Sequence, residues 1–376
     1  MKRFLAMLCI LALLPISARA VPEISAPSAI LMEASTGQIL HEADSHARLA
    51  PASVTKVMTL LLVMEALQSG TISWNDTVTA SASACAKGGS QVYLKEGEQM
   101  NMEEMVKSVV VASANDCACA LAEHIAGSES AFVEKMNQRA KELGMTDTHF
   151  VNCTGLDDSP EAKDHLTSAH DIAIMSRELL KHNDIRKYTT IWMDTVRGGE
   201  FGLTNTNKLV RFYEGTTGLK TGYTSSAGYC LAASALRDGM ELIAVVMHCK
   251  TSPDRFESAK ALLSHGFASY GLYRPDVLLE EIPVTLGVSP AVMPVLQSDS
   301  PILLEKSKLS SVQCETELAD VISAPVEQGQ TLGTVTVSAG EETVATIPIV
   351  ASCAVERLTW GQVTKLLLGA ACGVGL

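Results

Sequence analysis

Basic residues are scarce in this chain. Its 376 residues include 29 lysines and arginines against 42 aspartates and glutamates, a formal net charge of −13. Beyond residue 20 there are 26 basic against 42 acidic residues, a net charge near −16. Nucleic-acid binding depends on a basic patch and none stands out, so no nucleic acid is expected as a partner. The same charge disfavours attraction of most of the surface to anionic lipid.

Apolar runs long enough to cross a membrane are also missing at the N-terminus. The run over residues 4–14 follows two basic residues and is too short to span a bilayer easily. The sequence Ala18-Arg19-Ala20 after it has the A-x-A form of a cleavage site. Residues 1–20 are therefore predicted to be a secretory signal peptide, and the rest of the chain is predicted to be exported.

Close cysteine pairs are few. The chain has ten cysteines, nine of them after residue 20, so at least one lacks an internal partner. Cys117 and Cys119 form a C-x-C pair, but no second close pair or matched histidine spacing accompanies them. We expect them to be small buried residues, and we expect no metal and no cofactor. Free thiols in an exported chain fit poorly oxidising surroundings.

Three short motifs follow one another along the sequence. They are S-x-x-K from Ser53, S-x-N from Ser113 and K-T-G from Lys220. Each is common by chance, but all three in this order, each in a suitable local context, are typical of penicillin-binding proteins and serine β-lactamases.

The first motif has the composition of an activated nucleophile. Ser53 and Lys56 lie three residues apart, so on a helix they share a face, and the apolar run over residues 57–64 predicts a buried helix starting near Ser53. A serine hydroxyl needs a base within hydrogen-bond reach. Lys56 can serve only when neutral, which burial and a second cation such as Lys220 would favour. Judged alone, the motif would favour a helix cap and a solvated lysine; the other two motifs reverse this.

The other two motifs supply proton transfer and substrate binding. An apolar run stops at Ser113, as at a turn between helices, where a second hydroxyl can pass a proton between Lys56 and a leaving amine. The Asn115 amide can bind a substrate backbone, although an ordinary helix cap would look similar. Lys220 and Thr221 are predicted on a strand edge facing a cleft, where they would bind a carboxylate.

Longer stretches carry a closer resemblance. From about residue 26 to 267 the chain resembles the serine D-alanyl-D-alanine carboxypeptidases, the low-molecular-mass penicillin-binding proteins. Besides the motifs, the resembling phrases are residues 29–34 with Gly37, 88–94, 155–157, 165–171, 205–209, 228–231 and 242–246. The resemblance implies removal of the terminal D-alanine from peptidoglycan stem pentapeptides through an acyl-serine intermediate. It also implies inhibition by β-lactam antibiotics and action at the outer face of the cell membrane or in the cell wall.

The resemblance assigns roles by position. Ser53 resembles the acylated nucleophile, Lys56 its general base and Ser113 the proton shuttle. The substrate-binding residues would be Asn115, Lys220, Thr221, Gly222, Tyr223 and Arg255. The N–H groups of Ser53 and Tyr223 would form the oxyanion hole, and Arg255 would lie near the terminal carboxylate. The chain departs from some relatives in having Tyr223 where they have histidine, and Thr206 where they have a second arginine.

The predicted fold is of the α+β class. We expect a β-lactamase- or transpeptidase-like catalytic domain over residues 21–275, with an antiparallel sheet flanked by helices plus a helical lobe. Short β-rich runs separated by proline, glycine and serine then predict a small all-β domain over residues 276–350.

Residues 351–376 are predicted to be an amphipathic tail. The family resemblance favours a helix on the membrane surface, although glycines at 369, 373 and 375 weaken a helix. The uncharged run over residues 366–376 is too short to span a bilayer.

Three alternative functions remain open at this stage. A β-lactamase usually needs a carboxylate that activates water, and no E-x-x-L-N phrase lies between the second and third motifs. A D,D-endopeptidase would use the same chemistry on a cross-link. A non-catalytic wall-binding protein would carry a vestigial site, which the intact motifs oppose.

Overall fold

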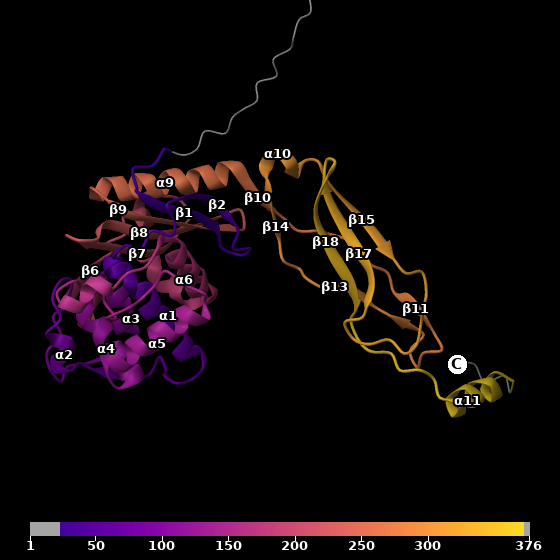
Figure 1. Ribbon diagram of the computed structural model, residues 1–376. Helices are drawn as coiled ribbons and strands as arrows, with labels where there is room; N and C mark the ends of the chain where they lie inside the picture. Colours follow the sequence, from indigo (N-terminus) through magenta and orange to yellow (C-terminus); the bar gives the residue numbers. More distant parts are fainter. Residues whose placement is uncertain (1–22, 372–376) are drawn as a thin grey trace, which may run out of the picture.

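The computed structural model describes residues 23–371 (Figure 1). The predicted signal peptide lies outside the described residues, as does the end of the predicted tail from residue 372 onwards.

The first part of the chain is built on a five-stranded antiparallel sheet in the order β2-β1-β9-β8-β7. Its strands are β1 (Ser28–Glu33), β2 (Ile39–Ala43), β7 (Thr216–Thr224), β8 (Gly228–Arg237) and β9 (Met240–Cys249). The middle residues of β8 and β9 are buried on both faces of the sheet, which explains why they read as continuous apolar runs rather than as an alternation. The strand β7, which carries the third motif, is an edge strand, as the sequence predicted.

Helices cover both faces of this sheet. On one face α9 (Ser252–Ser269) packs against β8 and β9. It begins at a capping box, in which Thr251 and Asp254 bond each other's backbone N–H. On the other face α6 (Ala169–Lys181) packs against β1 and β9.

A helical lobe continues from α6 away from the sheet (Figure 1). It contains α1 (Lys56–Gln68), α2 (Ala82–Cys85), α3 (Met102–Val111), α4 (Asn115–Ala126), α5 (Glu129–Glu142) and α7 (Arg186–Thr189), with the hairpins β3 (Thr77–Thr79)–β4 (Gln99–Asn101) and β5 (Met193–Val196)–β6 (Phe201–Thr204). The short α8 (Leu209–Phe212) packs against β7. Side-chain caps fix several starts: Asn101 accepts a backbone N–H at α3, Ser128 at α5 and Ser168 at α6. One buried apolar cluster joins this lobe to the sheet.

The C-terminal part is all β up to its last helix, apart from the short α10 (Lys306–Leu309). A four-stranded sheet has the order β13 (Pro294–Leu296), β18 (Glu342–Ala351), β17 (Thr331–Ala339), β15 (Val312–Leu318). A three-stranded sheet has the order β12 (Ala291–Val292), β11 (Ile282–Thr285), β16 (Ile322–Ser323). The α+β class and the all-β second part are therefore confirmed.

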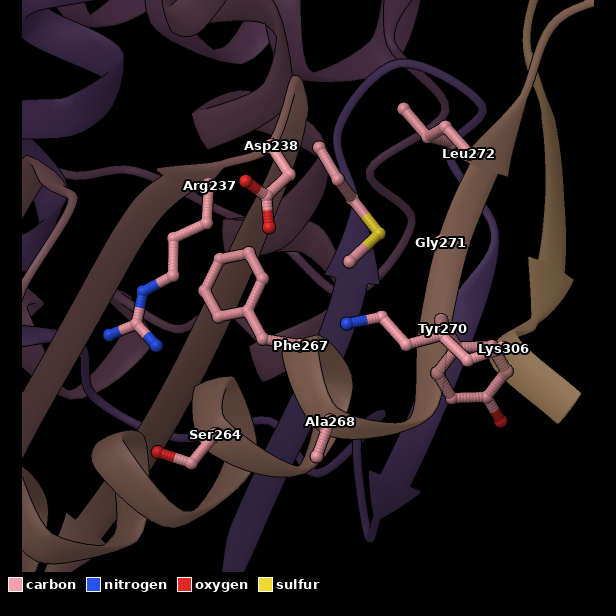
Figure 2. A pocket seen from close by; sticks show the side chains of 10 residues that line it. Arg237, Asp238, Ser264, Phe267, Ala268, Tyr270, Gly271, Leu272 and Lys306 are labelled. Atoms are coloured by element: carbon pink, nitrogen blue, oxygen red, sulfur yellow. The ribbon is translucent and has the colours of Figure 1, made fainter. Parts of the chain in front are cut away.

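A pair of strands connects the two parts. The strand β10 (Tyr270–Tyr273) follows α9 and pairs with β14 (Ile302–Glu305) of the C-terminal part. The boundary predicted at residue 275 falls directly after β10. At this junction lies a cavity of about 330 Å³, with Arg237 over the ring of Phe267 on one side and Lys306 on another (Figure 2). None of the three motifs lines this cavity, so it is not the candidate active site.

The tail forms the helix α11 (Trp360–Ala371), and its Trp360, Leu367 and Leu368 are largely exposed. No helix between residues 23 and 371 combines the length and apolar character needed to cross a membrane.

Candidate active site

Ser53 lies on a 3₁₀ turn, η1 (Ala52–Thr55), immediately before α1. Ala52 has a φ of 48°, a left-handed conformation that costs a non-glycine residue about 1–3 kcal/mol and is concentrated at functional sites. From this turn the part-exposed Ser53 meets the fully buried Lys56, whose Nζ is 2.9 Å from Ser53 Oγ. The predicted nucleophile and base are therefore in hydrogen-bond contact.

The surroundings of Lys56 favour a neutral amine. Burial lowers the pKa of Lys56 to about 7, against the opposing influence of Cys153 and Asp116. Lys56 Nζ also donates to the backbone carbonyl of Thr154, at 2.8 Å. A neutral amine bonded in this way keeps its lone pair for the proton of Ser53.

The loop around Thr154 fits closely under η1. A Cβ added to Gly155 would lie 1.8 Å from the carbonyl oxygen of Ala52, and Gly155 has a φ of +81°. Only glycine satisfies both constraints. His165 connects this loop to η1: its Nε2 is 2.8 Å from Thr55 Oγ1, and its Nδ1 accepts the N–H of Val151.

The second motif joins α3 to α4. Ser113 is 4% exposed, with a φ of 63°, and the residue capping α4 is Ala114, without a side-chain hydrogen bond. Ser113 therefore does not cap α4, which was the alternative to a functional role for this motif. Asn115 donates from Nδ2 to the carbonyl of Gly88 at 2.7 Å. In the described part of the chain its buried Oδ1 has no hydrogen-bond partner.

Asp116 fixes the loop beside this motif. Its carboxylate accepts the backbone N–H groups of Val92 and Leu94, at 3.2 and 3.0 Å. The N–H of Asn115 itself donates to the carbonyl of Ser90, at 2.7 Å. The phrase at residues 88–94 is thus a support that holds Asn115 in one orientation.

The third motif brings β7 against η1. A Cβ on Gly222 would lie 2.6 Å from the carbonyl oxygen of Pro51 and 3.1 Å from the nitrogen of Ser53. This close approach explains why glycine follows Lys220 and Thr221. Lys220 is buried. Burial, and to a smaller extent the positive charges of Lys56 and Arg255, lower the pKa of Lys220 well below its usual range.

The remaining predicted binding residues surround this strand. Thr221 Oγ1 donates to Thr206 Oγ1 at 2.7 Å. Tyr223 is exposed and stacks on Tyr229, with ring centroids 4.3 Å apart. The Arg255 side chain, on α9, contacts the backbone of the third motif: its Nη1 donates to the carbonyl of Gly222 at 2.9 Å.

Three supporting residues escaped sequence analysis. Thr154 acts through a backbone carbonyl, which no side-chain pattern reveals. Thr206 was noted only as a missing arginine, and Asp116, the residue after the second motif, was not singled out. In the sequence, the available signal was an aspartate directly after S-x-N, surrounded by small and apolar residues that predict burial.

The site and fold together define a class. A serine in contact with a buried lysine, beside a strand edge with a second buried lysine, is suited to acyl transfer through a covalent serine intermediate. The sequence model described as D-alanyl-D-alanine carboxypeptidase matches residues 16–251, and that described as the penicillin-binding protein 5 C-terminal domain matches residues 267–357. The chain belongs to the D-alanyl-D-alanine carboxypeptidase family.

Individual relatives agree with this membership. D-alanyl-D-alanine carboxypeptidase DacF of Bacillus subtilis is 42% identical over 333 residues, which cover 87% of this chain and 85% of that protein. The crystal structure of penicillin-binding protein 5 from Haemophilus influenzae matches with a TM-score of 0.77 and 32% identity, covering 90% of this chain and 99% of that chain. Penicillin-binding protein D2 of Listeria monocytogenes, solved with ampicillin bound, matches with a TM-score of 0.59 and 30% identity over 65% of this chain and 98% of that chain.

Proposed function

We propose that this protein is a serine D-alanyl-D-alanine carboxypeptidase that removes the terminal D-alanine from peptidoglycan stem pentapeptides. The observation that carries the assignment of roles is the 2.9 Å contact between Ser53 Oγ and the Nζ of a buried Lys56, whose pKa is lowered to about 7. Near neutral pH about half of such lysines are neutral and can accept a proton.

In the acylation step, Lys56 takes the proton of Ser53 while Oγ attacks the carbonyl carbon of the penultimate D-alanine. The N–H groups of Ser53 and Tyr223 are assigned to the developing oxyanion. The C–N bond then breaks, and the proton passes through Ser113 to the leaving amine of D-alanine. Water hydrolyses the ester in the second half of the reaction and regenerates Ser53. A β-lactam ring acylates the same oxygen.

Substrate binding follows from the unused polar groups. The unpaired Oδ1 of Asn115 is suited to accept a backbone N–H of the peptide. A terminal carboxylate beside Lys220 and Thr221 would favour the ammonium form of Lys220, whose positive charge burial otherwise opposes. Thr206 can then donate to Thr221 Oγ1, so that the proton of Thr221 turns to the carboxylate. Arg255 holds the backbone of Gly222 and adds positive charge behind this pair.

The test is a comparison of wild type with Ser53→Ala on a diacetyl-Lys-D-Ala-D-Ala peptide. Wild type should release one D-alanine per peptide and should be labelled once by fluorescent penicillin. The variant should do neither, while its circular dichroism and thermal midpoint stay within the wild-type range. A variant labelled at an unchanged rate would show that another residue is the nucleophile. Wild type that neither binds penicillin nor cleaves the peptide would favour the non-catalytic wall-binding alternative.

The location is part of the same proposal. Peptidoglycan lies outside the cell membrane, so the protein must act there, and residues 1–20 are assigned as the export signal. The helix α11 presents Trp360, Leu367 and Leu368 to the surroundings, side chains suited to the headgroup region of a bilayer. We assign α11 as a reversible membrane-surface anchor separated from the active site by the β domain.

A further inference from the structure

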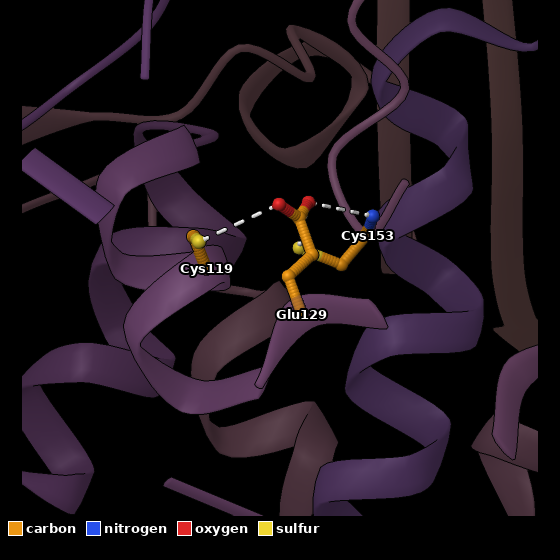
Figure 3. A group of neighbouring side chains, drawn as sticks. All are labelled: Cys119, Glu129 and Cys153. Carbon is orange, nitrogen blue, oxygen red and sulfur yellow. Dashed lines mark hydrogen bonds between the residues drawn. The ribbon is translucent and has the colours of Figure 1, made fainter. Parts of the chain in front are cut away.

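Three side chains from separate segments converge in the helical lobe, beside the active site but outside its chemistry. Cys119 lies on α4, Glu129 begins α5, and Cys153 lies in the loop before Thr154 (Figure 3). One ligand atom from each residue lies within 4.8 Å of the other two. The C-x-C partner Cys117 does not belong to this group. From the sequence we expected Cys117 and Cys119 to be small buried residues and expected no metal.

The separations are near those of a tetrahedral metal site. Glu129 Oε1 is 3.2 Å from Cys153 Sγ, and Glu129 Oε2 is 3.9 Å from Cys119 Sγ. Zinc–sulfur and zinc–oxygen bonds of about 2.3 and 2.0 Å at tetrahedral angles place ligand atoms about 3.5–3.8 Å apart. The two oxygen–sulfur separations differ from these values by a few tenths of an ångström, and the two sulfurs lie within 4.8 Å of each other, so shifts of up to about 1 Å would bring the atoms to coordinating positions.

Burial and charge also suit a cation. Both cysteines are fully buried, while the Glu129 side chain is 19% exposed and gives the cluster its outlet. As thiols, Cys119 and Cys153 each donate to the carboxylate of Glu129. The ammonium of Lys87 lies 2.5 Å from the same carboxylate. Two thiolates and one carboxylate around a divalent ion carry one net negative charge, which Lys87 would balance.

We propose that Cys119, Glu129 and Cys153 form a binding site for one thiophilic divalent cation of the zinc class. Binding exchanges the two S–H protons for two metal–sulfur bonds and adds one metal–carboxylate bond, so two protons leave and affinity rises with pH. The carboxylate of Glu123, 3.8 Å from Cys119 Sγ on the next turn of α4, is placed to supply a fourth ligand; the four-ligand site would carry two net negative charges, of which Lys87 balances one. The donor set of soft sulfur and one oxygen favours zinc or cadmium over magnesium or calcium.

The site would tie together two segments that support the catalytic groups. Cys153 directly precedes Thr154, whose carbonyl accepts the Lys56 Nζ–H. Cys119 follows Asn115 by one turn of α4. An ion held between them would fix the loop against the helix and would stabilise the folded lobe without contacting substrate.

The experiment uses the full chain, purified anaerobically with reductant, stripped of metal and titrated with Zn²⁺ against a chromogenic chelator. We expect one Zn²⁺ per chain at neutral pH, an affinity at least about 100-fold weaker in Cys119→Ser and in Cys153→Ser, and an unchanged affinity in Cys117→Ser. Cys117 is the matched control because it is equally buried on the same helix. Zn²⁺ should also raise the thermal midpoint of wild type and of the control, but not of the two cluster variants.

Cd²⁺ provides a test on wild type alone, which remains valid if a variant fails to fold. Its thiolate-to-metal charge-transfer absorption should correspond to two thiolates per chain. Absence of stoichiometric Zn²⁺ binding, or binding that persists in both cluster variants, would overturn the proposal. So would a metal-free wild type in which Cys119 and Cys153 are recovered as a disulfide that reductant does not open, because such a pair has no thiols to offer.

Discussion

The pH dependence of acylation tests the central assignment, that Lys56 is the general base. Lys56 must be neutral to accept the proton of Ser53, and its pKa is lowered to about 7 by burial. Below pH 7 the ammonium form prevails and the rate should fall as pH falls. Above pH 7 the amine form prevails and the rate should level off.

The magnitude follows from the two pKa values. A decrease from 10.5 to about 7 corresponds to about 5 kcal/mol against the ammonium form. At pH 7 an ordinary lysine is neutral in about 0.03% of molecules, whereas about half of Lys56 is neutral, an increase of about 1,000-fold in available base. Relative to its plateau, the acylation rate should be about one tenth at pH 6 and about one hundredth at pH 5.

The assay is single-turnover labelling by a fluorescent penicillin, followed from pH 5 to pH 9 with the folded fraction checked at each pH. Burial and the charges of His149 and Lys56 lower the pKa of His165 to about 4, so this neighbour should not titrate in the range. The His46→Gln variant is the control for a surface histidine, because hydrogen bonding to Asp147 raises the pKa of His46 from its ordinary value of 6.5.

Three results would refute the reasoning. They are a flat profile between pH 5.5 and 8.5, a half-maximal rate above pH 9, or a midpoint that moves in His46→Gln. The variant Lys56→Ala should lose about 10²–10⁴-fold in acylation rate and should lose the pH dependence as well. A rate within about threefold of wild type would transfer the base role elsewhere, with Lys220 the next candidate.

Other parts of the structure give further expectations. Thr221→Val should lower kcat/KM for the peptide by about 10- to 150-fold, because a hydrogen bond to a charged group contributes about 1.5–3 kcal/mol; an equal loss on a peptide with an amidated C-terminus would show that no carboxylate is bound there. Gly155→Ala should lower the free energy of unfolding by about 2 kcal/mol or more and the thermal midpoint by about 4–8 °C, because the added Cβ would clash with the Ala52 carbonyl. Gly144→Ala is the control, because Gly144 has a φ of +73° but open space around it. An equal effect there would mean that backbone strain alone is responsible. Deleting residues 358–376 should release the protein from liposomes of membrane lipid at an unchanged rate on soluble peptide; equal pelleting with the full chain would mean that α11 packs on the β domain.

The sequence by itself determined the class of chemistry. Ser53 and Lys56 had to share a face because helical geometry repeats within four residues, and an apolar run fixed that helix. The change to short β-rich runs after α9 predicted the second part, and β11, β14 and β17 form where those runs lie. These features are local, so composition and spacing were sufficient to find them.

Only the tertiary structure decided the features that depend on distant contacts. The lowered pKa of Lys56 results from complete burial, and its Nζ is held by a carbonyl 98 residues away. The need for glycine at 155 results from the position of Ala52, and the placement of Arg255 behind Gly222 results from α9 packing on the sheet. Cys119 meets Cys153 rather than Cys117 because residues two apart on a helix point in different directions. Such contacts are set by packing between segments, which no pattern within a single segment contains.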